Sequence, residues 1–334
     1  MKKQLPVLTI VVPCYNEEEV LPETINRLSA VLQDLCGENL IQKNSRILFV
    51  DDGSSDRTWP IIARESIKNP FVTGIKLSRN VGHQKALWAG YMKAREKSDC
   101  VISIDADLQD DIQVIKTFME KYHEGYEIVY GVRRKRDTDT FFKRTTALLF
   151  YRFMEKLGIE LVYNHADFRL LSKRALDELA RYHEQHLFLR GILPQIGFKS
   201  AKVYYDRKER LAGETKYPLK KMVAFALDGI TSFSIVPLRL ITFAGFFLFV
   251  TGILLGIYSL VKPEQPASFL LYTFISVFTG LQLLAIGVIG EYIGKIFYEV
   301  KRRPKYAIEI DLFTSPILKS NKGQDRPESG YSVK

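Results

Sequence analysis

The stretch Val101-Ile102-Ser103-Ile104-Asp105-Ala106-Asp107-Leu108-Gln109-Asp110 decides how this sequence folds. Its apolar start is typical of a buried β-strand, and the strand ends in two carboxylates one residue apart. Open α/β sheets bind ligands outside the carboxyl ends of their strands. Mg²⁺ and Mn²⁺ are held by one or two carboxylates plus substrate phosphates, so this strand end could anchor a metal that bridges to a nucleotide diphosphate. Asp is also a common turn residue, and the stretch alone is compatible with a surface turn.

The same design recurs along the first part of the chain. Short β-branched runs at residues 8–12, 46–50 and 73–77 each lead into a polar loop and then a helical pattern, and the Asp-x-Asp strand is the fourth. A further strand is expected near 127–130. Repeated strand, loop and helix predict an α/β fold with a parallel, doubly wound, Rossmann-like sheet whose loops gather along one edge.

The composition narrows the function classes. A chain of 334 residues can hold one large domain or two medium ones, and a net charge of +10 favours a negatively charged partner: nucleic acid, an anionic membrane surface or a phosphorylated substrate. The three cysteines, Cys14, Cys36 and Cys100, lack metal-ligand spacing and indicate neither a disulfide framework nor a zinc site. The apolar run near the amino terminus stops at Pro13 without a cleavage site, so we interpret it as a strand rather than a signal peptide.

Two stretches before the carboxyl-terminal part carry many cations. Residues 141–157 form a helical pattern with a broad apolar face flanked by Lys and Arg, which fits either a core-facing helix or an amphipathic helix in a membrane interface. Residues 199–221 contain eight Lys or Arg against three acidic residues. Such a basic stretch favours phosphate groups or lipid headgroups.

Two transmembrane helices are predicted at 240–261 and 269–290, each with 22 residues and no charge. About 20 apolar residues cross a hydrocarbon core, and the link at 262–268 makes the pair a hairpin. Cations flank the outer ends of the pair, and Lys262 alone lies between the spans, so the positive-inside rule predicts that the catalytic part and both termini are cytoplasmic. The predicted organisation is a cytosolic domain at 1–217, an interfacial helix region at 218–239, a membrane hairpin at 240–290 and a basic return segment with a flexible tail at 291–334.

With these pieces placed, the chain resembles the polyprenyl-phosphate glycosyltransferases, inverting enzymes of the nucleotide-diphospho-sugar transferase (GT-A) fold, and among them the bacterial bactoprenol glucosyltransferases. Six motifs carry the resemblance, in the order of the family. They are Val12-Pro13-Cys14-Tyr15-Asn16-Glu17-Glu18, Val50-Asp51-Asp52-Gly53-Ser54-Ser55-Asp56, Ser78-Arg79-Asn80-Val81-Gly82, Asp105-Ala106-Asp107-Leu108-Gln109, Asp167-Phe168-Arg169-Leu170 and Gly213-Glu214-Thr215-Lys216-Tyr217.

The resemblance implies a nucleotide-sugar site and a metal site. The residues implied for the nucleotide sugar are Pro13, Tyr15, Glu17, Val50, Asp52, Asp105, Ala106 and Arg133. Asp52 would accept a hydrogen bond from the base, Tyr15 would pack against it, and Ala106 would lie close to the ribose. Asp105, Asp107 and Gln109 match the site for Mg²⁺ or Mn²⁺, with Asp107 as the first choice for a direct ligand.

The catalytic residues implied by the resemblance are Asp107, Asp167, Arg210 and Lys216. Arg133, Arg210 and Lys216 would hold the diphosphate and the acceptor phosphate. A lipid phosphate is already anionic at neutral pH, so strong base catalysis is unnecessary. Asp167 would therefore orient the acceptor or take a proton from a monoanionic phosphate, or it forms a structural salt bridge with Arg169.

The implied reaction is metal-dependent transfer of one sugar, with inversion, from a nucleotide diphosphate to polyprenyl phosphate at the cytoplasmic face of the plasma membrane. The expected substrates are UDP-glucose and undecaprenyl phosphate, and no nucleic acid partner is expected. A processive polysaccharide synthase and a non-catalytic scaffold or flippase partner remain as alternatives. Gly245, Gly252 and Gly256 in the first span offer close-packing surfaces, so a homo-oligomer is expected, although these glycines could equally serve packing inside the hairpin.

Overall fold

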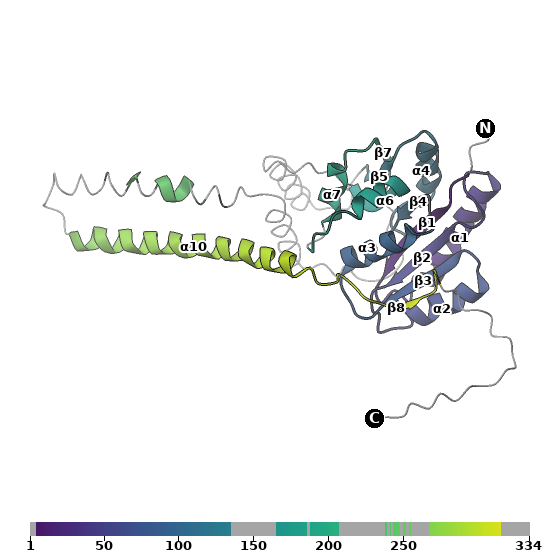
Figure 1. Ribbon diagram of the computed structural model, residues 1–334, viewed down its shortest axis with the longest axis horizontal. Coiled ribbons are helices and arrows are strands. Elements are labelled where there is room, and N and C mark those ends of the chain that lie inside the picture. Colours follow the sequence, from purple (N-terminus) through teal and green to yellow (C-terminus); the bar gives the residue numbers. More distant parts are fainter. Residues whose placement is uncertain are drawn as a thin grey trace, which may run out of the picture. The chain divides into compact units, whose positions relative to one another are not determined.

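The computed structural model describes residues 5–134, 165–185, 188–206, scattered positions between 238 and 254, and 267–314 (Figure 1). The chain divides into two compact units. Unit 1 comprises residues 1–120 and 306–334, and unit 2 comprises residues 121–305.

Unit 1 contains the predicted doubly wound sheet. Strands β1 (Leu8–Cys14), β2 (Arg46–Asp51), β3 (Val72–Leu77) and β4 (Cys100–Ser103) are parallel, in the order β4-β1-β2-β3. Helices α1 (Leu21–Gly37), α2 (Thr58–Lys68) and α3 (His83–Ala94) follow the first three strands, and α4 (Val114–His123) follows the fourth. The four predicted strand–loop–helix repeats are therefore confirmed, and the polar loops at the carboxyl ends of the strands share one edge of the sheet.

Helix α3 packs closely on the centre of this sheet through Gly90. A Cβ atom at Gly90 would lie 2.3 Å from Val11 Cγ1 and 2.9 Å from Val50 Cγ2. The absence of a side chain thus lets the helix backbone approach β1 and β2 directly. This contact fixes the helix whose first residue, His83, follows the carboxyl end of β3.

A short strand near the carboxyl terminus completes the sheet of unit 1. Strand β8 (Ile308–Asp311) pairs antiparallel with β3, and Leu312 and Phe313 after it are buried. Backbone hydrogen bonds extend the pairing at both ends, from Ser78 N to Ala307 O (3.0 Å) and from Leu312 N to Gly74 O (2.9 Å). This strand lies within residues 291–334, for which only a basic return segment and a flexible tail were predicted.

Unit 2 contributes three paired strands of mixed direction. Strand β5 (Ile128–Arg133) pairs antiparallel with β6 (His165–Ser172) and parallel with β7 (Ser200–Tyr205). Helices α6 (Lys173–Leu179) and α7 (Leu189–Gln195) follow β6 in the chain. The strand expected near 127–130 is β5.

The long helix α10 (Ala267–Lys301) covers the second predicted span and continues beyond it. Its segment Phe278–Lys301 is the one helix in the described part of the chain that is long and apolar enough to cross a membrane. Apolar side chains such as Leu271, Leu284 and Ile286 are exposed along it.

The other predicted membrane elements lie largely outside the described residues. Of the first span, residues 243–247 are helical, and Thr251 Oγ1 donates a hydrogen bond to Phe247 O (2.9 Å). The amphipathic helix at 141–157 and the tail from Ser315 are not described, and of the interfacial region at 218–239 only Leu238 is.

Candidate active site

The loops after β1 and β2 in unit 1 are held together by side chains that bond to backbone amides. Asn16, in a left-handed conformation (φ 53°), receives a hydrogen bond from Ser55 N to its Oδ1 (2.9 Å), and its own N–H donates to Ser54 Oγ (3.0 Å). Glu17 N donates to Thr58 Oγ1 (2.9 Å). These bonds connect the loop after β1 with the loop after β2, which lies about 40 residues further along the chain. We call these two connected loops the rim.

The predicted nucleotide residues are distributed over this rim. Pro13 and Val50 are buried strand neighbours in β1 and β2, so they form the floor beneath the rim. Tyr15 is 45% exposed, which leaves its ring open to a ligand, and Glu17 is half-buried.

Asp52 holds the loop before α3. Its carboxylate is 3% exposed and accepts hydrogen bonds from Val81 N (2.8 Å) and Gly82 N (3.0 Å). Burial raises the pKa of the Asp52 carboxyl, and these two bonds offset part of that rise. Each carboxylate oxygen has further acceptor capacity, so the expected bond to the base stays a prediction.

The neighbouring Asp51 is a feature that the motif alone did not single out. It is fully buried at the end of β2. Burial raises the pKa of its carboxyl, and interactions with Ser54 and the charge of Lys76 offset part of that rise. Buried carboxylates with a shifted pKa cluster at functional sites.

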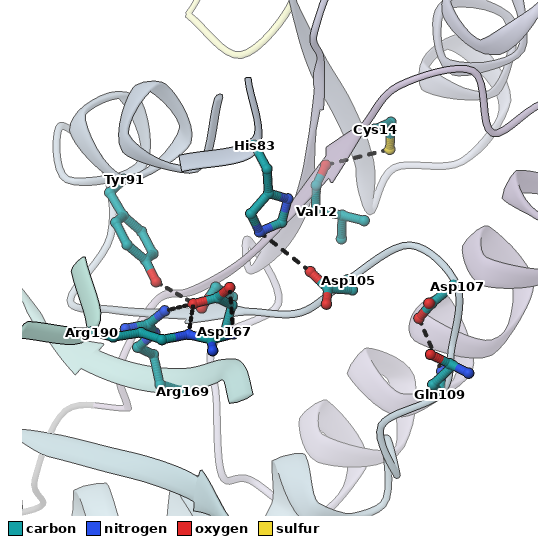
Figure 2. A network of polar contacts seen from close by, with 11 residues as sticks. Val12, Cys14, His83, Tyr91, Asp105, Asp107, Gln109, Asp167, Arg169 and Arg190 are labelled. Atoms are coloured by element: carbon teal, nitrogen blue, oxygen red, sulfur yellow. Dashed lines mark hydrogen bonds and ion pairs between the residues drawn. The ribbon is translucent and has the colours of Figure 1, made fainter. Parts of the chain in front are cut away.

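The Asp-x-Asp stretch forms a loop directly after β4, with Asp105 and Asp107 both partly exposed (Figure 2). Leu108 adopts a left-handed conformation (φ 52°), and Gln109 N donates to Asp107 Oδ1 (3.2 Å). Ala106 is 4% exposed, and its carbonyl accepts a hydrogen bond from Thr24 Oγ1 of α1 (2.7 Å). The surface-turn alternative thus describes the local backbone, while α1 anchors the loop at the carboxyl ends of the parallel strands.

His83 is a site residue that the sequence analysis left without a role. Its Nε2 lies 3.6 Å from Asp105 Oδ1, and Figure 2 shows the imidazole of α3 directed at this carboxylate. No metal spacing links His83 to other residues, so only the packing of α3 on the sheet brings the two side chains together.

The side chains of this loop fit a divalent cation whose coordination shell is completed by oxygens of a bound substrate. Two carboxylates and the Gln109 amide provide the oxygen ligands that Mg²⁺ and Mn²⁺ prefer. Among the described residues no cluster of three or more His, Cys, Asp or Glu side chains could hold a metal by itself. A cation here would therefore need oxygens from a bound diphosphate, as expected for one or two protein carboxylates.

Unit 2 contributes a separate cluster of Asp167, Arg169 and Arg190 (Figure 2). Asp167 of β6 forms an ion pair with Arg169, the residue that the sequence analysis considered as its structural partner. It also pairs with Arg190 of α7, whose Nη2 lies 3.2 Å from Asp167 Oδ2. Arg190 was not predicted as a site residue, because α7 brings it to Asp167 from 23 positions further along the chain.

Three other predicted cations are placed differently. Arg133 ends β5 and is half-buried. Arg210 and Lys216 lie outside the described residues, as do Lys135 and Arg136.

Comparison with known proteins places this site in a family. The model of glycosyl transferase family 2 matches residues 9–180, and that of the GtrB C-terminal hairpin matches residues 236–296. The chain is 64% identical to the uncharacterized glycosyltransferase YkoT of Bacillus subtilis, over 99% of this chain and all of that protein. It is 38% identical to the SfII prophage-derived bactoprenol glucosyl transferase of Shigella flexneri, over 90% of this chain and 97% of that protein. The resemblance found from the motifs is confirmed, and the chain belongs to glycosyltransferase family 2.

Proposed function

We propose that this glycosyltransferase moves a single glucose from UDP-glucose to a polyprenyl phosphate, with undecaprenyl phosphate as the expected acceptor. The observation that carries the proposal is the match, over nine tenths of the chain, to a protein named bactoprenol glucosyl transferase. The match to the GtrB C-terminal hairpin and the exposed apolar surface of α10 support an acceptor that resides in a membrane. The plasma membrane, with the catalytic part and both termini on its cytoplasmic side, is the proposed location.

The rim of unit 1 would bind the donor. Tyr15 would pack against the base, Asp52 would accept a hydrogen bond from it, and Asp105 and Asp107 would hold Mg²⁺ or Mn²⁺ together with the diphosphate. The bound cation would supply positive charge where negative charge develops on the leaving UDP. Arg133 would add a fixed cation to the diphosphate, a preorganised electrostatic contribution of the kind that dominates such transfers.

The acceptor phosphate would be the nucleophile. One of its oxygens would form a bond to the anomeric carbon while the bond from that carbon to the β-phosphate oxygen of UDP breaks, and the electron pair leaves with UDP. Attack opposite the leaving group converts an α-linked donor into a β-linked product. Because the attacking oxygen is already anionic, Arg210 and Lys216 would need only to position the phosphate and balance its charge.

Transfer of radiolabelled sugar into an organic-extractable lipid tests this function. The full chain, purified in detergent, is incubated with undecaprenyl phosphate, Mg²⁺ or Mn²⁺, and a panel of UDP- and GDP-sugars. We expect label in the lipid phase with UDP-glucose, its loss with EDTA, and its loss in Asp107→Ala while the protein stays folded.

Three results would contradict the proposal. If another donor gave extractable label and UDP-glucose did not, the transferred sugar would be the one which that donor carries. Label in a polymer instead of a lipid would favour the processive synthase, and nucleotide binding without any transfer would favour a scaffold.

A further inference from the structure

We infer that His83 is a positioning residue of the donor site: its imidazole orients the carboxylate of Asp105 for a divalent cation and the diphosphate of the bound nucleotide sugar. The inference rests on the proposed function, because it assumes a nucleoside diphosphate donor. Both residues belong to unit 1, His83 as the first residue of α3 and Asp105 in the loop after β4.

The imidazole faces the carboxylate at close range. His83 Nε2 lies 3.6 Å from Asp105 Oδ1, and Figure 2 shows the ring directed at this carboxylate. The side chains of His83 and Asp105 are 38% and 35% exposed. Both groups are therefore within reach of a ligand from solution, and the ligand would meet them as a pair.

The backbone at the start of α3 fixes the place of this imidazole. Gly82 precedes the helix with φ 91°, and its carbonyl accepts hydrogen bonds from Lys85 N and Ala86 N (both 3.0 Å). The N–H of the same glycine donates to Asp52 (3.0 Å). The residue before His83 is thus held through both of its backbone polar groups, so the direction of the imidazole depends mainly on the two side-chain torsions of His83.

His83 also acts on the carboxylate that is proposed to bind the base. Burial raises the pKa of Asp52, while two amide hydrogen bonds and the charge of His83 oppose that rise. The imidazole therefore lies within electrostatic range of Asp52 as well as next to Asp105. In the proposed function one of these carboxylates serves the base of the donor and the other serves its diphosphate.

The chemistry of imidazole suits a position beside a metal ligand. A neutral imidazole that carries its proton on Nε2 presents an N–H donor to the carboxylate and adds no positive charge beside a bound cation. A lysine or arginine at this position would compete with the cation for the carboxylate. A hydrogen-bonding partner holds a ligating carboxylate in the orientation that the metal requires, and the loss of such a partner costs roughly 10- to 100-fold in metal affinity.

The test measures Mn²⁺ binding to the full-length protein in detergent with UDP present, from the EPR signal of the free ion. In His83→Ala we expect the affinity for Mn²⁺ to fall roughly 10- to 100-fold. The affinity for UDP in EDTA should equal that of the wild type, because the imidazole acts through a carboxylate that binds the cation. His83→Gln carries an amide N–H near the position of Nε2 and should retain more of the Mn²⁺ affinity than His83→Ala.

A double-mutant cycle separates positioning through Asp105 from an independent effect of His83. Asp105→Asn should itself weaken Mn²⁺ binding. Adding His83→Ala to it should cause little further loss, because the carboxylate that His83 orients is already gone. Additive losses, or no loss in Asp105→Asn, would overturn the inference.

His183→Ala is the matched control for removal of a histidine. His183 is exposed and belongs to unit 2, so this variant should bind Mn²⁺ like the wild type. Should His83→Ala fail to fold, as judged by thermal unfolding, His83→Leu takes its place, since leucine keeps bulk at the position but offers no N–H.

Binding assays keep the inference testable whether or not the protein transfers glucose, so its failure and that of the proposed function are distinguishable. Mn²⁺ affinity in His83→Ala equal to that of the wild type refutes the positioning role, even if kcat or the melting temperature falls. No Mn²⁺ binding by the wild type with UDP present refutes it too. An equal loss of UDP affinity with Mn²⁺ and in EDTA would show that His83 contacts the nucleotide itself, which also contradicts a role through Asp105.

Discussion

The substitution Asp52→Asn tests how the rim of unit 1 is built. Asp52 is 3% exposed and accepts two amide hydrogen bonds, from Val81 N at 2.8 Å and from Gly82 N at 3.0 Å. Asparagine has one carbonyl oxygen for these two donors, and its NH₂ group would face the second one. One charged hydrogen bond is therefore lost, the other becomes neutral, and a buried N–H remains without an acceptor.

The expected cost follows from these changes. A charged hydrogen bond contributes about 1.5–3 kcal/mol and a neutral one about 0.5–1.5 kcal/mol, so the two bonds lose roughly 2–5 kcal/mol between them. Relief of the buried charge, which raises the pKa of Asp52, returns part of this loss. We expect a net destabilisation of about 2 kcal/mol, which lowers the melting temperature by roughly 4–8 °C in a domain of this size.

The assay is thermal unfolding of the full-length protein in detergent, with Asp34→Asn as the control. Asp34 is exposed on α1, and its substitution should leave the melting temperature unchanged within about 1 °C. The pKa of Asp52 is raised in the folded protein, so its carboxyl takes up a proton more readily there than in the unfolded chain. Lowering the pH through this raised pKa therefore stabilises the folded wild type, whereas the variant has no carboxyl to titrate there, so the difference between Asp52→Asn and the wild type should grow. A melting temperature equal to that of the wild type at pH 7 would refute the view that Asp52 holds the loop before α3.

Three further predictions concern the rim, the carboxyl-terminal strand and the metal. Gly53→Ala should destabilise unit 1 by more than about 2 kcal/mol, because Gly53 has φ 67° and a Cβ there would lie 2.6 Å from the Arg79 carbonyl carbon. Gly37→Ala, where a Cβ meets nothing within 4 Å, is the control, and equal unfolding midpoints for the two variants would contradict the clash. Burial raises the pKa of Asp311, but hydrogen bonds from Thr314 and Lys93 outweigh it, so the pKa is lowered. The stabilisation by Asp311 is present above the ordinary pKa of about 3.9 and is lost as pH falls through the lowered value. Hydrogen exchange corrected for intrinsic rates should then show β8 amides losing protection below about pH 4, and unchanged protection there would exclude this role. EDTA should abolish transfer by the wild type, Mg²⁺ or Mn²⁺ should restore it, and Asp107→Ala should not respond to either ion; full activity in EDTA would exclude the metal.

The motifs predicted the part of the fold that depends on local patterns. Alternating strands and helices with polar loops at strand ends are visible in short windows, and β1 to β4 occur where they were expected. The Asp-x-Asp loop and the rim of unit 1 could be placed for the same reason, because the carboxyl ends of parallel strands must share an edge. A long uncharged apolar run likewise marks a candidate membrane helix without any tertiary information, as α10 illustrates.

Other features depend on contacts between distant segments. Strand β8 is only four residues long, so its alternating sequence Ile308-Glu309-Ile310-Asp311 is too short to predict a strand, and pairing with β3 defines it. His83 is near Asp105 because Gly90 lets α3 lie directly on the sheet. The sequence motif identifies Asp52, but it does not reveal the hydrogen bonds that Asp52 accepts from Val81 N and Gly82 N. Those bonds form because the loop before α3 folds back onto the carboxylate.

The sequence by itself determined the family, the order of the elements and the residue types at the ends of the strands, because these are encoded in local periodicity and in motifs. The tertiary structure decided which of those residues are bound to one another. Asp167 illustrates the division, since its motif left both a catalytic and a structural role open. Only the packing of β6 and α7 reveals that one carboxylate serves a sealed arginine and an exposed one. Charged residues that are far apart in the sequence form one cluster when folding brings them together. Burial then excludes the water that would otherwise screen their charges.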